Sequence, residues 1–363
     1  MTDLSTEPAA ASVTPAAAAT RPATTWRQDL ITVGLSAWLM IGLFVDGWAH
    51  NQLGGLETFF TPWHALFYSG FTATGLWILR LVTMRIRDGR TWRDALPAGY
   101  GLGLAGLAVF AAGGAADLVW HSLLGIEVSV DALLSPPHLL LFTGAALIVA
   151  SPLRAGWARL ERTPALGRLL PALLSAALLT SLVSFFFMYI NAWFSWEPTR
   201  EYAEWIATLP VGEYDYAGTG QVTGVASILI TNLIVTGPLL YLTRRWRLPA
   251  GSATLLVVIV AALTSALSAF SQPLLLVGAL VGGMLVDLLL RRLDPGPGRR
   301  GAFLLTGGVV PLAIWAPHLA AVAIGKGIAW PVELWFGVVV MAALGGLALA
   351  LLMAPSPAPA DAA

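Results

Sequence analysis

Residues Asp46–Gly70 read DGWAHNQLGGLETFFTPWHALFYSG, and a related stretch, Asp117–Gly144, reads DLVWHSLLGIEVSVDALLSPPHLLLFTG. Both contain, in the same order, Asp-x-x-x-His, Gly-[Leu/Ile]-Glu, [Thr/Ser]-Pro-x-His and x-Leu-x-aromatic-[Ser/Thr]-Gly. The chain has five histidines, and the repeat contains His50, His64, His121 and His138. A repeated Asp/His pattern in an otherwise apolar chain indicates two copies of one functional unit.

The composition is that of an integral membrane protein. Of the 363 residues, 57% are hydrophobic and 11% are charged, and the mean hydropathy is +0.76, whereas soluble domains carry about 25% charged residues. The formal net charge is zero, which provides no basic surface for nucleic acid. Because the chain has no cysteine, disulfides and thiolate metal sites are excluded, and any metal ion must be bound by histidine and carboxylate.

The distribution of apolar residues predicts an all-α, polytopic transmembrane bundle. A membrane span needs about 20 mainly apolar residues, and about ten stretches of this chain meet that requirement. The expected spans are residues 28–50, 62–84, 98–121, 136–154, 169–191, 222–243, 250–270, 272–291, 302–324 and 330–353. Spans one and two, and spans three and four, would form two similar hairpins, over residues 27–84 and 98–154, and the remaining spans occupy 169–353.

The arginines predict the orientation of these spans. They cluster in alternate loops, which follow spans two, four, six and eight. The positive-inside rule places these loops in the cytoplasm, so ten spans would leave both termini there, in a protein of the inner or plasma membrane. Residues 1–26 and 354–363 are rich in alanine and proline and are expected to be disordered tails around a transmembrane domain of residues 27–353.

The repeat brings together ligands that suit a metal ion. Asp46 and His50, like Asp117 and His121, are four residues apart and so share one face of a helix near its outer end. Thr61-Pro62 and Ser135-Pro136 are typical of a helix N-cap followed by proline in the first turn. His64 and His138 would then start the returning helices and supply a third ligand to each group.

Other residues on the same side of the membrane are weaker candidate ligands. His318 follows a proline in the outer half of span nine, Glu57 and Glu127 occupy matching loop positions, and Glu333 lies just inside span ten. The alternative interpretation is that these histidines hydrogen-bond at the membrane interface and that the aspartates only cap helices or form ion pairs. Repetition of the whole unit favours metal binding at Asp46, His50, His64, Asp117, His121 and His138, with His318 as an additional ligand. Histidine and carboxylate suit copper, zinc or iron.

The spacing of these residues resembles the metal-binding helices of the C subunit of copper membrane monooxygenases, the family of particulate methane and ammonia monooxygenases. Its Asp-His-His site corresponds here to Asp46, His50 and His64, and its neighbouring Asn-His-His site falls on Asp117, His121 and His138, with aspartate in place of asparagine. The resemblance covers about 25 residues in each copy. It implies an oxidoreductase that activates O2 at copper to hydroxylate a small apolar substrate, together with other membrane subunits or a redox partner. Trp48, Trp63, Trp120 and Tyr68 would then shape a pocket.

Two other classes of function fit the sequence, a metal-handling protein and a b-type cytochrome. A copper or zinc delivery protein would need the same ligands without catalysis, whereas a permease would also need a polar path across the bilayer, and the inner halves of the spans are almost purely apolar. A b-type cytochrome would use histidines on facing helices to bind haem. A purely structural subunit would leave the repeated Asp/His unit unexplained. The partner that the composition itself implies is the lipid bilayer.

Overall fold

The computed structural model describes residues 21–53, 60–125, 130–210, 215–296 and 298–354. Within these residues the regular structure is helical, apart from one isolated β-bridge between Thr199 and Ile328. Nine helical segments in the described part of the chain are long and apolar enough to cross a membrane: α1 (Trp26–Gln52), α2 (Pro62–Arg87), α3 (Gly101–Leu124), α5 (Pro136–Val149) continued by α6 (Ser151–Arg159), α7 (Leu166–Phe186), α9 (Tyr216–Arg245), α11 (Leu274–Leu293), α12 (Arg300–Gly325) and α13 (Val332–Met353). The all-α class and the multi-pass membrane character are confirmed.

Four shorter helical segments complete the described secondary structure. They are α4 (Val130–Leu134), the 3-10 turn η1 (Met188–Ile190), α8 (Arg200–Ala207) and α10 (Ser252–Ala266). The helix starts follow local chemistry. Thr25 and Gln28 form a capping box at the start of α1, and Thr61 caps α2 ahead of Pro62.

Residues 250–270 were predicted to form a full membrane span, but the helix found there, α10, has only 15 residues. A helix of this length is about 22 Å long, shorter than the roughly 30 Å hydrocarbon core of a bilayer. Yet α10 runs from one end of the bundle to the other: the Ala253 amide donates to Asp287 in the last turns of α11, and Gln52 at the end of α1 donates to the Leu267 carbonyl. Neighbouring helices surround α10, since none of its residues is exposed. Nine of the ten predicted spans are therefore confirmed, and the tenth is a short interior helix.

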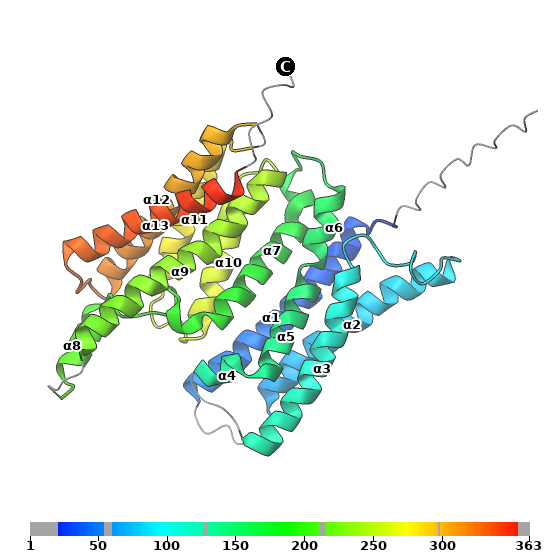
Figure 1. Cartoon of the computed structure of the whole chain (residues 1–363), viewed down its shortest axis with the longest axis horizontal. Helices are drawn as coiled ribbons and strands as arrows, with labels where there is room; N and C mark the ends of the chain where they lie inside the picture. Colours follow the sequence, from blue (N-terminus) through cyan, green and yellow to red (C-terminus); the bar gives the residue numbers. More distant parts are fainter. Residues whose placement is uncertain (1–20, 54–59, 126–129, 211–214, 297, 355–363) are drawn as a thin grey trace, which may run out of the picture.

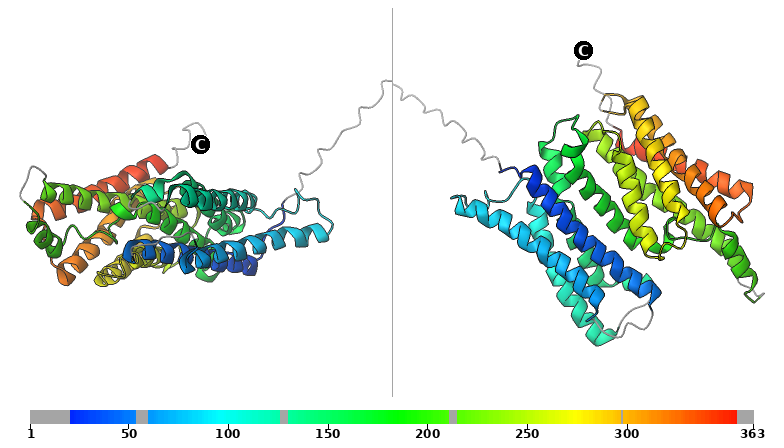
Figure 2. Two further views of the ribbon diagram at one scale, coloured as in Figure 1. Left: turned by 90° about the horizontal axis from the view of Figure 1, so that it is seen from below. Right: turned by 180° about the vertical axis from the view of Figure 1, so that it is seen from behind.

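The helices form two halves, each with its own hydrophobic core. Helices α1 to α5 build the N-terminal half, α9 to α13 build the C-terminal half, and α7 contributes to both cores (Figure 1). In the rear view of Figure 2, α1 and α2 lie side by side as an antiparallel hairpin. Helices α3 and α5 form the second hairpin, as the repeat predicts.

The glycine that ends each copy of the repeat allows its hairpin to close. A Cβ atom on Gly70 in α2 would lie 2.6 Å from the backbone of Leu39 in α1. A Cβ atom on Gly144 in α5 would lie 2.6 Å from the backbone nitrogen of Phe110 in α3. Both matched glycines are therefore needed for the same reason: the two helices of each hairpin approach each other too closely for a side chain at this position.

The arginine-rich loops gather at one end of the bundle. Arg159 Nη2 lies 2.7 Å from Asp29 Oδ2 near the start of α1, and Arg247 Nε lies 2.7 Å from Asp294 Oδ1 after α11. The Arg247 amide also donates to the Arg162 carbonyl at 2.8 Å. Helix α1 begins and α13 ends at this same end, at the top of Figure 1. The repeated aspartates and histidines lie toward the opposite end.

Candidate metal centre

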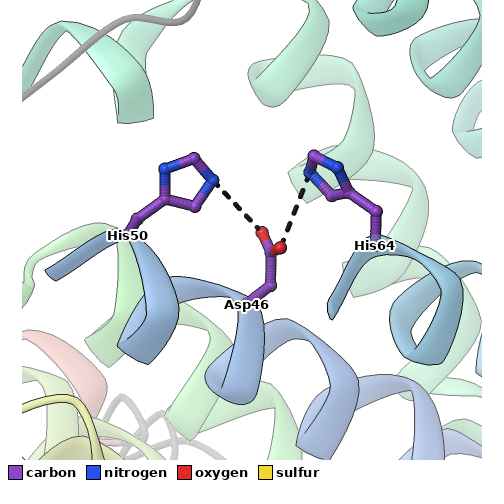
Figure 3. Close-up of side chains that lie close together, drawn as sticks. All are labelled: Asp46, His50 and His64. Atoms are coloured by element: carbon purple, nitrogen blue, oxygen red, sulfur yellow. Dashed lines mark ion pairs between the residues drawn. The ribbon is translucent and has the colours of Figure 1, made fainter. Parts of the chain in front are cut away.

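The first Asp/His group joins the end of α1 to the start of α2. Asp46 and His50 lie one turn apart in the last turns of α1, and His64 lies in the first turn of α2. Asp46 Oδ2 is 3.8 Å from His50 Nε2, and Asp46 Oδ1 is 3.6 Å from His64 Nε2 (Figure 3). The Thr61 hydroxyl accepts a hydrogen bond from the His64 amide at 3.1 Å, which fixes the first turn of α2.

The second group repeats this arrangement in α3 and α5, with shorter distances. Asp117 Oδ1 is 3.3 Å from His121 Nε2 and 3.1 Å from His138 Nε2. Asp117 is almost fully buried, at 1% exposed. The sequence therefore predicted correctly which six residues come together, and in which sets of three.

Each group has the size of a site for one metal ion. The ligand atoms of each set of three lie within 4.8 Å of one another. Ligands about 2.1 Å from a common ion lie about 3.0–3.4 Å apart in octahedral or tetrahedral geometry. The distances of 3.1 and 3.3 Å in the second group fall in this range, and those of 3.6 and 3.8 Å in the first group exceed it by a few tenths of an ångström.

Both aspartates present a buried oxygen whose polar neighbours are the histidine ring nitrogens of its own group. These atoms are Oδ1 of Asp46 and Oδ1 of Asp117. An unsatisfied buried carboxylate oxygen is costly and rare in folded proteins. Each of these atoms lies next to histidine nitrogens, so a cation placed among the three side chains would satisfy it. The residues present thus fit a metal ion, and one that accepts nitrogen and oxygen ligands.

The hydrogen bonds of the second group also favour a cation at its centre. His121 Nδ1 lies 3.1 Å from the Gly125 carbonyl oxygen, which can only accept, so Nδ1 carries the proton. In the neutral ring Nε2 then has a lone pair, and it lies 3.3 Å from the Asp117 carboxylate. Two electron-rich atoms at this distance repel each other unless a metal ion or a proton lies between them. Support of a ligating histidine through its other nitrogen is the usual arrangement in metal sites.

His138 is supported in a related way. Its Nδ1 lies 2.8 Å from the Ser135 hydroxyl. Ser135 is the N-cap residue of α5, as predicted, but its side chain makes no cap hydrogen bond. The matching Thr61 does make the cap, because its hydroxyl accepts a hydrogen bond from the His64 amide. The sequence did not reveal this difference, because serine and threonine are equally suited to either role.

Both groups line one cavity of about 290 Å³ in the N-terminal half. The rest of its lining is largely apolar and includes Phe67, Phe142, Phe185, Phe186 and Met188. The prediction that Trp48, Trp63, Trp120 and Tyr68 shape a pocket is wrong, because none of them is among the described residues that line this cavity. The phenylalanines of α7 had no signal in the sequence, since α7 lies outside the repeat.

One tyrosine of the cavity wall lies outside the membrane-spanning helices. Tyr189, in η1, lines the cavity and is partly buried. Burial raises its pKa above the ordinary value of tyrosine. Its hydroxyl therefore stays neutral at physiological pH and adds no charge beside the two groups.

The additional candidate ligands lie elsewhere. His318 in α12 is 2% exposed and packs edge-on against Trp315, with ring centroids 5.3 Å apart. Neither His318 nor Glu333, in the first turn of α13, belongs to either Asp/His group. A role for His318 as a ligand stays a prediction. Glu57 and Glu127 lie outside the described residues.

Comparison of the chain with models of protein families, with curated proteins and with solved structures finds no match. The fold and the geometry of the two groups therefore define the class: a polytopic, helical membrane protein with two candidate Asp/His metal sites.

Proposed function

We propose that the protein is a copper-binding membrane protein that holds one ion in each Asp/His group. The observation that carries this proposal is that two Asp-His-His sets, each with an unsatisfied buried carboxylate oxygen, line the same apolar cavity. Asp46, His50 and His64 would hold one ion, and Asp117, His121 and His138 the other. Zinc and iron accept the same ligands, and the resemblance of the repeat to copper membrane monooxygenases favours copper.

The site faces the extracytoplasmic side in this proposal. Four arginine-rich loops meet at the opposite end of the bundle, and the positive-inside rule assigns that end to the cytoplasm. Both termini would then be cytoplasmic, in an inner or plasma membrane. Copper would reach the groups from the oxidising side of the membrane.

The cavity supports an oxidoreductase acting on a small apolar substrate. Bound copper would supply the redox chemistry with O2 that the protein side chains lack. The residues of this chain would bind the ions, keep bulk water out with the phenylalanine side chains, and hold an uncharged substrate by apolar contact. Electrons would come from a redox partner or from another membrane subunit.

A second candidate function is delivery of copper or zinc to another protein. It is supported by the greater exposure of the first group, where the His50 side chain is 30% exposed and so open to exchange. A permease is less well supported, because it needs a polar path across the bilayer, whereas Leu39, Leu141, Leu182 and most other residues that line the cavity are apolar.

Copper-loaded protein in lipid nanodiscs tests the proposal. With a quinol reductant, the proposal predicts O2 consumption that rises when a short-chain alkane is added, and release of the corresponding alcohol. Asp46→Ala/His50→Ala and Asp117→Ala/His121→Ala variants are the controls. Metal binding without O2 consumption would favour delivery, a Soret band would indicate a cytochrome, and protein that binds no metal would overturn the proposal.

A further inference from the structure

Tyr68 belongs to the first hairpin but contacts the second metal group. It lies one turn after His64 in α2, and its hydroxyl donates to Oδ2 of Asp117 in α3 at 3.2 Å. Its ring centroid is 6.2 Å from that of His64. A single side chain thus contacts the buried carboxylate of one group and lies beside a histidine of the other.

We propose that Tyr68 is a positioning residue for the second metal group: its hydroxyl engages Oδ2 of Asp117, so that Oδ1 alone is presented to the ion. This inference rests on the proposed function, because it assumes that the group binds metal. The two oxygens of Asp117 are already divided in this way, since Oδ1 lies beside the nitrogens of His121 and His138.

The structure contains a space for the tyrosine. Gly114 in α3 lies against its ring, and a Cβ atom there would be 2.9 Å from Tyr68 Cε1 and 3.3 Å from the hydroxyl oxygen. Any residue larger than glycine at this position would therefore crowd the ring and force it or the helix to shift. Phe67 and Phe110 hold the other parts of the ring, with centroids 5.1 and 6.2 Å away.

The arrangement has no counterpart in the first group. The repeat aligns Tyr68 with Phe142, which lines the cavity and has no hydroxyl. At the position that matches Tyr68, the second hairpin therefore has no hydroxyl to offer Asp46. Tyr68 makes the two sites unequal and couples the second site to the position of α2.

Buried ligating carboxylates are usually oriented by a hydrogen bond, and loss of such a partner typically lowers metal affinity by about 10- to 100-fold. Without the tyrosine hydroxyl, both Asp117 oxygens become available to the ion. We therefore expect a change in the ligand set of the second site as well as in its affinity.

The test uses the full-length protein with one site removed at a time. In an Asp46→Ala/His50→Ala background only the second site binds Cu(II), and Tyr68→Phe should weaken binding about 10-fold and shift the copper hyperfine splitting in the EPR spectrum. Gly114→Ala, which leaves the tyrosine in place but displaces it, should act in the same direction. In an Asp117→Ala/His121→Ala background, Tyr68→Phe should change the Cu(II) affinity of the first site by no more than about twofold, because the inference gives Tyr68 no part in positioning that site's ligands.

Tyr189→Phe is the matched control, because it removes a hydroxyl from a tyrosine that lines the cavity but is not hydrogen-bonded to Asp117 in the described structure. A melting temperature measured for each variant separates loss of affinity from loss of fold. Equal effects of Tyr68→Phe at both sites, or no effect at the second, would overturn the inference while leaving the proposed function intact. Background proteins that bind no copper would overturn both.

Discussion

The two hairpins carry the same motif but support it differently. In the first, the Asp-to-His distances are 3.6 and 3.8 Å and the Asp46 side chain is 14% exposed. In the second, they are 3.1 and 3.3 Å and the Asp117 side chain is 2% exposed. The second group also has hydrogen bonds from His121 to Gly125, between His138 and Ser135, and from Tyr68 to Asp117. The ligand residues thus define where a metal can bind, and their supporting contacts decide how firmly the site is preorganised.

The largest expected effect is the loss of one site when its aspartate loses its charge. Asp117→Asn should weaken metal binding at the second group by roughly 100-fold or more, because a buried charged partner of the ion is removed. Asp46→Asn should weaken the first group less, since that carboxylate is more exposed and less dependent on the ion. Isothermal titration with Cu(II) would measure both. An equal loss in the two variants would show that burial does not distinguish the groups.

A smaller effect should separate the matched residues Thr61 and Ser135. Ser135→Ala removes the partner of the His138 ring and should lower copper affinity at the second site about 10-fold. Thr61→Ala removes a helix cap instead, so it should cost about 1 kcal/mol of stability with little change in affinity at the first site. Metal titrations and thermal melts of the two variants check this. If Thr61→Ala reduced affinity as much as Ser135→Ala, the difference between the hairpins would be disproved.

The smallest effect is a difference in acid sensitivity between the sites. Metal binds neutral histidine, so protons compete with it and binding weakens as the pH falls. Two histidines bind in each group, so a tenfold difference in affinity separates the release midpoints by about 0.5 pH unit. The second site should release its ion at the lower pH. Copper retained after equilibrium dialysis across pH 4–8, measured in the two single-site proteins, gives both midpoints, and the reverse order would contradict the comparison.

Sequence reasoning predicted the parts of the fold that local patterns encode. Ten apolar stretches were predicted to span the membrane, and nine of them form helices of sufficient length in the described residues. The four-residue spacing of Asp46 and His50 correctly placed both on one face of α1. The length of α10 could not be predicted, because an interior helix is equally apolar whether or not it matches the thickness of the bilayer. An apolar helix can be shielded from water by lipid or by the rest of the protein, and hydropathy does not distinguish the two.

The contacts within the candidate site were only partly predictable. The six residues of the two groups could be identified because the repeat aligned them. Tyr68 was expected to shape a pocket, whereas it bonds to Asp117, a contact that depends on how α2 packs against α3 and that no local pattern encodes. For the same reason the role of α7, whose Phe185 and Phe186 line the cavity, required the tertiary structure.

The most direct test of the account is the metal content of purified, detergent-solubilised protein, measured by mass spectrometry. The account predicts two copper ions per chain in the native protein, one in Asp46→Ala/His50→Ala, one in Asp117→Ala/His121→Ala, and none when all four substitutions are combined. His318→Ala should leave the count at two if the six residues of the two groups are sufficient. A lower count would show that His318 is also a ligand, as the sequence predicts. Metal content that is the same in all these variants, or absent under copper-replete conditions, would show that the two Asp/His groups do not bind copper.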